Sequence, residues 1–182
     1  MNVITKAVLM CAITTASWTQ TAQAQDEAAK PAPLEAYFCN YQPGKGMSDL
    51  MDVAERFAKW ADKNDPSYSA WILTPSYGQF AELPQVVWLG SNPSGNEMGE
   101  GQVTWRASGG DLQKAFDKVI ACGAHSVASS VPISPSEGNP GDGVVMFTQC
   151  EIDDGSDWMK AIAAHKSYSA AMRGLGSKGS TW

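Results

Sequence analysis

The pattern of apolar and polar positions predicts a strand followed by a helix near the start of the folded chain. Residues 34–41 are rich in aromatics and alternate, with Tyr37 and Cys39 on one side and Asn40 on the other, as in a strand. A turn with two glycines follows, and Ser48 is the expected N-cap of a helix. The apolar face of this helix consists of Leu50, Val53, Ala54, Phe57, Trp60 and Ala61.

Four strands and one helix are predicted between this helix and residue 134. Residues 68–74 and 85–90 have the β-branched and aromatic content of strands. Residues 91–101 are expected to form a long loop, and residues 102–106 a short strand. An apolar stripe predicts a helix over residues 111–122, and residues 125–133 alternate as a strand. The principal order is therefore βαββαβ, an α+β ferredoxin-like unit over residues 34–133, with an antiparallel sheet and both helices on one face.

A weaker copy of the opening strand and helix follows a linker at residues 134–143. Residues 143–152 predict a strand, and residues 157–172 a helix. Asp157-Trp158-Met159 repeats Asp49-Leu50-Met51, and in the same alignment His165 takes the place of Phe57. We interpret residues 144–182 as the start of a second, incomplete unit and the chain as a truncated fragment of a duplicated protein. The alternative is a natural ending with an additional docked βα element.

This order and internal duplication resemble the dimeric α/β-barrel superfamily, in which two βαββαβ units pair their sheets face to face. The resemblance rests on element order, because no diagnostic motif is present. Its members include cofactor-free monooxygenases, haem-degrading and haem-binding enzymes and small stress-response proteins. It implies self-pairing of the units and a ligand cavity between the sheet and the helices.

The first 24 residues have the features of a signal peptide. Lys6 is their only charged residue, an apolar run follows it, and Ala22-Gln23-Ala24 is typical of a cleavage site. A periplasmic or secreted protein is therefore expected, with residues 25–33 as a flexible leader. The net charge of −6 and the absence of a basic cluster exclude nucleic acid as a partner, and no membrane contact is expected after cleavage.

Three cysteines remain once Cys11 leaves with the signal peptide. In a ferredoxin-like unit the first strand and the second helix end at the same edge, so Cys39 and Cys122 are disulfide candidates in an oxidising compartment. The alternative is three buried free thiols. By the logic of the repeat, Cys150 pairs with a cysteine beyond Trp182. No cysteine or histidine spacing indicates a zinc site or haem attachment.

The candidate ligand pocket combines aromatic and polar residues of the predicted strands. Trp71 and Trp88 lie on adjacent strands and are expected to share a face, with Tyr37 and Asn40 as polar groups. The alternative role of these aromatics is packing in the sheet core. His165 is expected to face the sheet or the cavity, either as an acid–base group or haem ligand, or as a histidine held by a neighbour.

These features predict an exported small-molecule-binding or structural protein, with a small apolar or aromatic molecule as the expected ligand. The alternatives are a cofactor-independent monooxygenase-like enzyme that uses the helix–sheet cavity with His165 or Tyr37, and a haem-binding protein with His165 as axial ligand. We expect His125 to be exposed at the start of its strand. The acids around Gly155 fit helix capping better than a calcium loop, no metal or cofactor is expected, and catalysis is left open.

Overall fold

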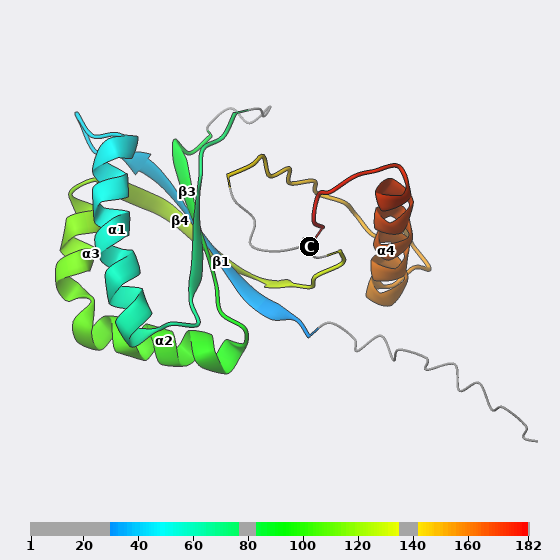
Figure 1. Ribbon diagram of the computed structural model, residues 1–182, viewed down its shortest axis with the longest axis horizontal. Coiled ribbons are helices and arrows are strands. Elements are labelled where there is room, and N and C mark those ends of the chain that lie inside the picture. The colour runs from blue at the N-terminus through cyan, green and yellow to red at the C-terminus, as the bar shows by residue number, and fades with distance from the viewer. Residues whose placement is uncertain (1–29, 77–82, 135–141, 182) are drawn as a thin grey trace, which may run out of the picture.

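The computed structural model describes residues 30–76, 83–134 and 142–181, which form one four-stranded antiparallel sheet and four helices (Figure 1). The elements in order are β1 (Ala32–Tyr41), α1 (Met47–Asn64), β2 (Ser69–Leu73), β3 (Val86–Ser91), α2 (Gly95–Ser108), α3 (Gly110–Asp117), β4 (Ile120–Ser130) and α4 (Trp158–Gly174). The predicted signal peptide lies outside the described residues. Strand β1 begins at Ala32, inside the segment expected to be a leader.

The sheet has the strand order β2-β3-β1-β4, with every neighbouring pair antiparallel. Helices α1, α2 and α3 lie on one side of it (Figure 1). This arrangement confirms the predicted α+β ferredoxin-like fold. It also makes β1 a central strand, so side chains of β1 contact both halves of the sheet.

The core lies between the sheet and the helices, and the amphipathic face of α1 covers it. Its buried members are Cys39, Leu50, Val53, Val86, Val119 and Ile120. Helix α1 begins one residue before the predicted cap. Gly46 is the N-cap, and its N–H donates to the Asp49 carboxylate over 3.1 Å. A carboxylate in the first turn is stabilised by the free N–H groups there.

The loop and short strand predicted over residues 91–106 are wrong, because helix α2 occupies most of this segment. Ser94 Oγ accepts from the Glu97 N–H over 3.2 Å and donates to the Glu97 carboxylate over 2.7 Å. Ser94 is thus the N-cap that starts the helix in spite of its glycines. No residue of α2 is buried, which explains why no apolar stripe marks it in the sequence.

The helix predicted over residues 111–122 is too long. Helix α3 ends at Asp117, and the N–H of Val119 donates to the carbonyl of Phe116 in a turn that leads into β4. The apolar residues assigned to the end of the helix stripe are buried at this turn and at the start of β4. Strand β4 therefore begins five residues before the predicted strand.

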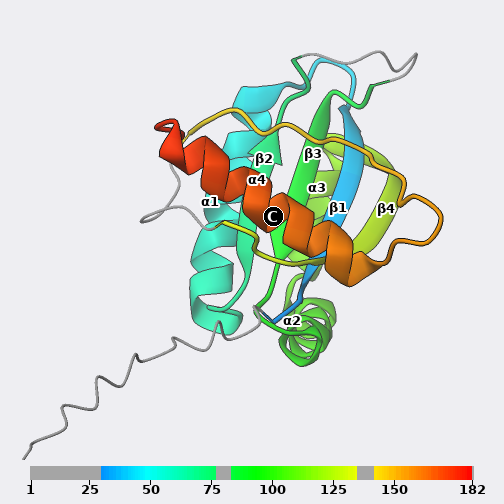
Figure 2. The same cartoon turned by 90° about the vertical axis from the view of Figure 1, so that its right-hand side faces the viewer.

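Of the second predicted unit, only the helix is formed. Residues 143–150 form no strand ladder with the rest of the described chain, so the predicted strand at 143–152 is not formed here. Helix α4 crosses the sheet on the side opposite to α1, α2 and α3 (Figure 2). Ser134, which follows β4, contacts the α4 segment. It forms an antiparallel β-bridge with Thr181, and its hydroxyl accepts a hydrogen bond from Arg173 Nε over 2.6 Å.

No helix in the described parts of the chain has both the length and the apolar character needed to span a membrane.

Candidate functional site

A buried carboxylate is the least expected feature of the helix-facing side of the sheet. Glu35 lies on β1 at the same alternation as Tyr37 and Cys39, and only 3% of its surface is exposed. A carboxylate in such a position costs solvation free energy unless donors surround it. The sequence analysis did not identify it.

Three side chains place polar groups around Glu35, one from the same strand and two from distant parts of the chain. The hydroxyl of Tyr68 donates to Oε1 over 2.9 Å, and the hydroxyl of Tyr37 donates to Oε2 over 3.2 Å. Nε2 of His125, on β4, lies 3.3 Å from Oε2. Trp88 Nε1 donates in turn to the Tyr68 hydroxyl over 3.0 Å. We call these five residues the Glu35 centre.

The two phenols of the Glu35 centre are held as hydrogen-bond donors. Burial, reinforced by the negative charge of Glu35, raises the pKa of Tyr37 to about 12. Burial and the same charge raise the pKa of Tyr68 further above its usual value. Both hydroxyls therefore keep their protons at neutral pH and stabilise the carboxylate.

His125 connects the buried carboxylate with the protein surface. Its ring stacks on that of Tyr37, with 4.0 Å between centroids and 6° between planes. Its side chain is 42% exposed, as the sequence led us to expect. When Nε2 carries the proton and donates to Glu35, Nδ1 is left with a free lone pair. Among the described residues, Glu35 is the only hydrogen-bond partner of this imidazole.

An aromatic wall separates the Glu35 centre from the helices. Phe57 of α1 lies at the middle of this wall, with its ring 5.1 Å from Trp88 and 5.7 Å from Tyr68, both edge to face. Trp105 of α2 and Phe116 of α3 also pack against Phe57, and Phe116 packs against Trp88. The low polarity of this wall strengthens the hydrogen bonds to Glu35.

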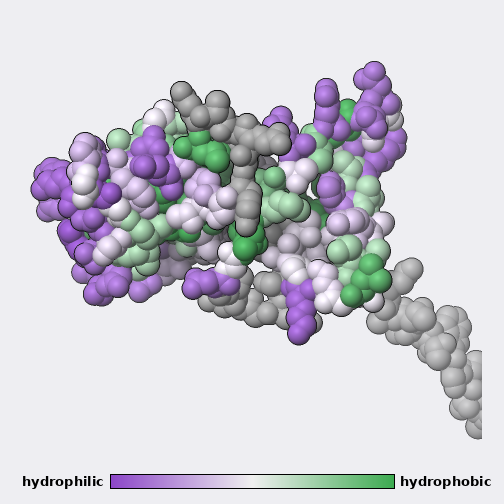
Figure 3. Space-filling view, turned by 90° about the horizontal axis from the view of Figure 1, so that it is seen from above, coloured by the Kyte–Doolittle hydropathy of each residue, from purple (hydrophilic) through white to green (hydrophobic). Residues whose placement is uncertain are grey.

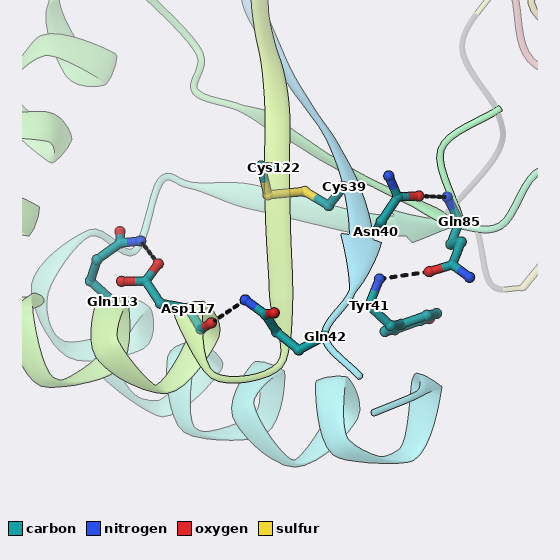
Figure 4. Close-up of a disulfide and its surroundings, with 8 residues drawn as sticks. All are labelled: Cys39, Asn40, Tyr41, Gln42, Gln85, Gln113, Asp117 and Cys122. Atoms are coloured by element: carbon teal, nitrogen blue, oxygen red, sulfur yellow. Dashed lines mark hydrogen bonds between the residues drawn. A yellow bond between two sulfur atoms is a disulfide. The ribbon is translucent and has the colours of Figure 1, made fainter. Parts of the chain in front are cut away.

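The Cys39–Cys122 disulfide joins β1 to β4 (Figure 4), and Cys39 lies two residues beyond Tyr37 on β1. The two cysteines are paired directly across the strands, and Tyr37 pairs with His125 farther along the same ladder. The bridge thus holds together the two strands that bring Glu35 and His125 into contact. Cys122 lies on β4, not at the end of a helix as predicted, and Cys150 is an exposed free thiol.

The predicted pocket residues divide between the two faces of the sheet. Tyr37 and Trp88 belong to the Glu35 centre. Trp71 pairs with Leu89 and Ile72 pairs with Trp88, so the expectation that Trp71 and Trp88 share a face is wrong. Asn40 is exposed, and its Oδ1 accepts from the N–H of Gln85 over 3.1 Å.

His165 is exposed on α4, on the side of the sheet opposite to the Glu35 centre (Figure 2). Its side chain therefore does not face the layer between the sheet and helices α1–α3. The alignment of His165 with Phe57 had predicted that it would face the sheet or the cavity. This position gives no support to the haem-binding alternative, in which His165 is the ligand.

Two open hollows of the described surface lie away from the Glu35 centre. One, of ≈ 550 Å³, follows the outer side of α2 along Gly95, Gly99 and Val103. The other, of ≈ 440 Å³, lies between charged residues of α1 and α3. No group of three or more potential metal ligands occurs within the described residues. Neither hollow is lined by a residue of the Glu35 centre.

Neither a protein-family model nor a curated protein sequence matches the chain. The solved structures that are similar to it at low identity include the following two. The crystal structure of a proposed chlorite dismutase is 12% identical with a TM-score of 0.35, covering 55% of this chain and 44% of that one. The solution structure of a hypothetical Arabidopsis thaliana protein is 13% identical with a TM-score of 0.39, covering 62% and 97%. The chain thus spans less than half of the first protein, and likeness at this level does not bear on function.

Proposed function

We propose that the chain is a small-molecule-binding protein and that its ligand binds at the Glu35 centre. The observation that carries this proposal is the burial of Glu35 together with its contact to a half-exposed imidazole. Replacing buried charges by apolar residues is often neutral or stabilising for a fold. A fully hydrogen-bonded carboxylate that touches a solvent-accessible group therefore favours a role in recognition over a purely structural one.

The surface around His125 favours a planar, apolar or aromatic ligand. One face of the imidazole is covered by Tyr37. Val127 lies two residues farther along β4, opposite Glu35 in the ladder, and is 60% exposed. A flat molecule placed over His125 and Val127 would remove apolar surface from water, at about 25 cal/mol per Å². The imidazole would supply the polar contact that fixes its orientation.

Titration with indole as a planar probe, followed by NMR, tests this proposal. We expect saturable shifts centred on His125 and Val127, and their loss in His125→Ala. The matched control is Trp71→Ala, which removes an exposed aromatic from the other face of the sheet and should leave the shifts in place. Shifts that follow Trp71, or the absence of any saturable shift, would contradict the proposal.

Export to an oxidising compartment is part of the same proposal. The signal-peptide pattern supports it, and so does the Cys39–Cys122 disulfide, because such bonds persist mainly outside the cytosol. N-terminal sequencing of the protein recovered from the cell envelope or the medium is expected to start at Gln25. An intact N-terminus on protein retained in the cytosol would count against export.

A second candidate is a structural role through self-pairing of ferredoxin-like units. Phe38 is 37% exposed and Trp71 41% exposed on the sheet face away from α1. On the α4 side of the molecule, hydrophobic side chains are interspersed with hydrophilic ones (Figure 3). The partner in this candidate is a second copy of the chain. Light scattering would then give a dimer that Trp71→Ser weakens, whereas a monomer at all concentrations would oppose it.

Internal duplication remains part of this second candidate. Helices α1 and α4 have nearly equal lengths, 18 and 17 residues. Their starts differ, because Asp49 lies inside α1 whereas the aligned Asp157 is the N-cap of α4 and accepts from the Lys160 N–H. The proposed repeat therefore rests on the sequence alignment, because the capping differs and the strand expected before α4 is not formed.

A further inference from the structure

We infer that the Glu35 centre transfers protons, with His125 as the base for the ligand and Glu35 as the residue that positions it. The inference rests on the proposed function, since it assumes that a ligand binds beside His125. It adds a substrate class, namely planar aromatic molecules with an acidic hydroxyl, such as phenols.

The contact between Glu35 and His125 fixes which imidazole nitrogen is the base. Oε2 of Glu35 lies 3.3 Å from Nε2, so the proton on Nε2 is retained in the hydrogen bond to the carboxylate. Nδ1 then carries the lone pair, and stacking on Tyr37 restrains the plane of the ring.

The other members of the centre are unsuited to act as the base. The two tyrosine hydroxyls donate to Glu35, and their raised pKa values keep them protonated. The Trp88 indole is a donor only. Glu35 is enclosed and already accepts from its neighbours. Only His125 combines a lone pair with access to solvent.

The proposed step needs no oxidant or cofactor. The O–H bond of the phenol breaks, its electron pair stays on the oxygen, and the proton forms a new N–H bond at Nδ1. The charge of the imidazolium is offset by Glu35, and the phenolate remains beside it as an anion. Release of the proton to water regenerates the neutral imidazole.

4-Nitrophenol tests this step directly, because its neutral and anionic forms absorb at different wavelengths. The whole chain is mixed with the probe at a pH where the free probe is mostly neutral. We expect the anion band to grow with saturation of the site. His125→Phe keeps an aromatic ring over Tyr37, so it should still bind the probe but in the neutral form.

The Glu35→Gln variant tests whether Glu35 positions His125, because it removes the negative charge but keeps the size of the side chain. Its affinity for the neutral form of the probe should stay within about threefold of the original. The ratio of anionic to neutral bound probe should fall about tenfold or more, because a hydrogen bond to a charged group contributes about 1.5–3 kcal/mol. Ser129→Ala, an exposed change on the same strand, is the matched control and should alter neither quantity.

The outcomes distinguish the two proposals. Saturable binding without an anion band overturns proton transfer and leaves ligand binding standing. An anion band that persists in His125→Phe excludes His125 as the base, and one that persists in Glu35→Gln excludes positioning by Glu35. Failure of both indole and 4-nitrophenol to bind overturns both proposals.

Discussion

Gly90 lies directly opposite Glu35 in the β1–β3 ladder, and the space left by its missing side chain is occupied by the hydroxyl of Tyr68. A Cβ at this position would collide with the Tyr68 oxygen and ring. The glycine therefore permits the shortest hydrogen bond to Glu35, the one from Tyr68. The geometry of the Glu35 centre therefore depends on Gly90, although this residue contributes no polar side chain.

Replacing Gly90 by alanine is expected to disrupt the centre. Displacement of Tyr68 leaves Oε1 of Glu35 without its donor, and a buried unsatisfied group costs about 1–3 kcal/mol. Denaturant unfolding should show a loss of that size. Gly99→Ala is the control, because it lies in α2 with open space around it and should be neutral or stabilising by up to about 1 kcal/mol. Equal effects at the two glycines would contradict the role given to Gly90.

Removal of the Tyr68 hydroxyl should also destabilise the fold. Tyr68→Phe deletes the donor to Glu35 and the acceptor for Trp88 Nε1, so we expect a loss of about 1–3 kcal/mol in the free energy of unfolding. The intrinsic fluorescence should change as well, since the indole of Trp88 loses its partner. Tyr168→Phe, on the exposed surface of α4, should change neither. A Tyr68→Phe variant as stable as the original would mean that Glu35 is adequately solvated without this bond.

The raised tyrosine pKa values predict a loss of stability in alkali. The pKa of Tyr37 is about 12 in the folded chain and about 10 in an unfolded one. Between these values the folded state holds a proton that the unfolded state has released, so the free energy of unfolding falls as pH rises. This contribution is complete below about pH 10. Tyr37→Phe should show a shallower fall between pH 10 and pH 12 in denaturant titrations, and an identical slope would contradict the assignment.

Loss of the Cys39–Cys122 bridge should weaken the pairing of β1 with β4. We expect Cys39→Ala/Cys122→Ala to lower the free energy of unfolding by about 2–4 kcal/mol. Because these strands bring Glu35 to His125, binding of 4-nitrophenol should weaken in parallel. Cys150→Ser removes an exposed free thiol and should leave stability and binding unchanged. A double variant that keeps both its stability and its binding of 4-nitrophenol would show that the β1–β4 hydrogen bonds hold these strands together without the disulfide.

The sequence predicts the fold well where one face of an element is buried. Alternation locates β1 to within two residues, and β-branched and aromatic content locates β2 and β3 to within one. The stripe from Leu50 to Ala61 predicts α1. Helix α2 was missed because none of its residues is buried and its glycines are typical of loops. The Ser94–Glu97 cap was the available signal, since Ser-x-x-Glu marks the start of a helix.

The Glu35 centre was harder to predict than the fold. Glu35 shares its alternation with Tyr37 and Cys39, which already indicates an acid on the buried face of a strand. Its partners Tyr68 and His125 lie 33 and 90 residues away in the chain. Their convergence depends on strand order and on the register of β4, neither of which is encoded in local periodicity. The Trp71–Trp88 expectation failed for the same reason, since one step in register exchanges the faces of a sheet.

The tautomer of His125 is the most direct test of the account, and long-range ¹H–¹⁵N correlation NMR measures it. The hydrogen bond to Glu35 predicts that the neutral ring carries its proton on Nε2, and that Glu35→Gln shifts the population toward Nδ1 while the backbone shifts of β1 and β4 change little. A proton on Nδ1 in the unmodified protein, or a tautomer population that Glu35→Gln leaves unchanged, would contradict it.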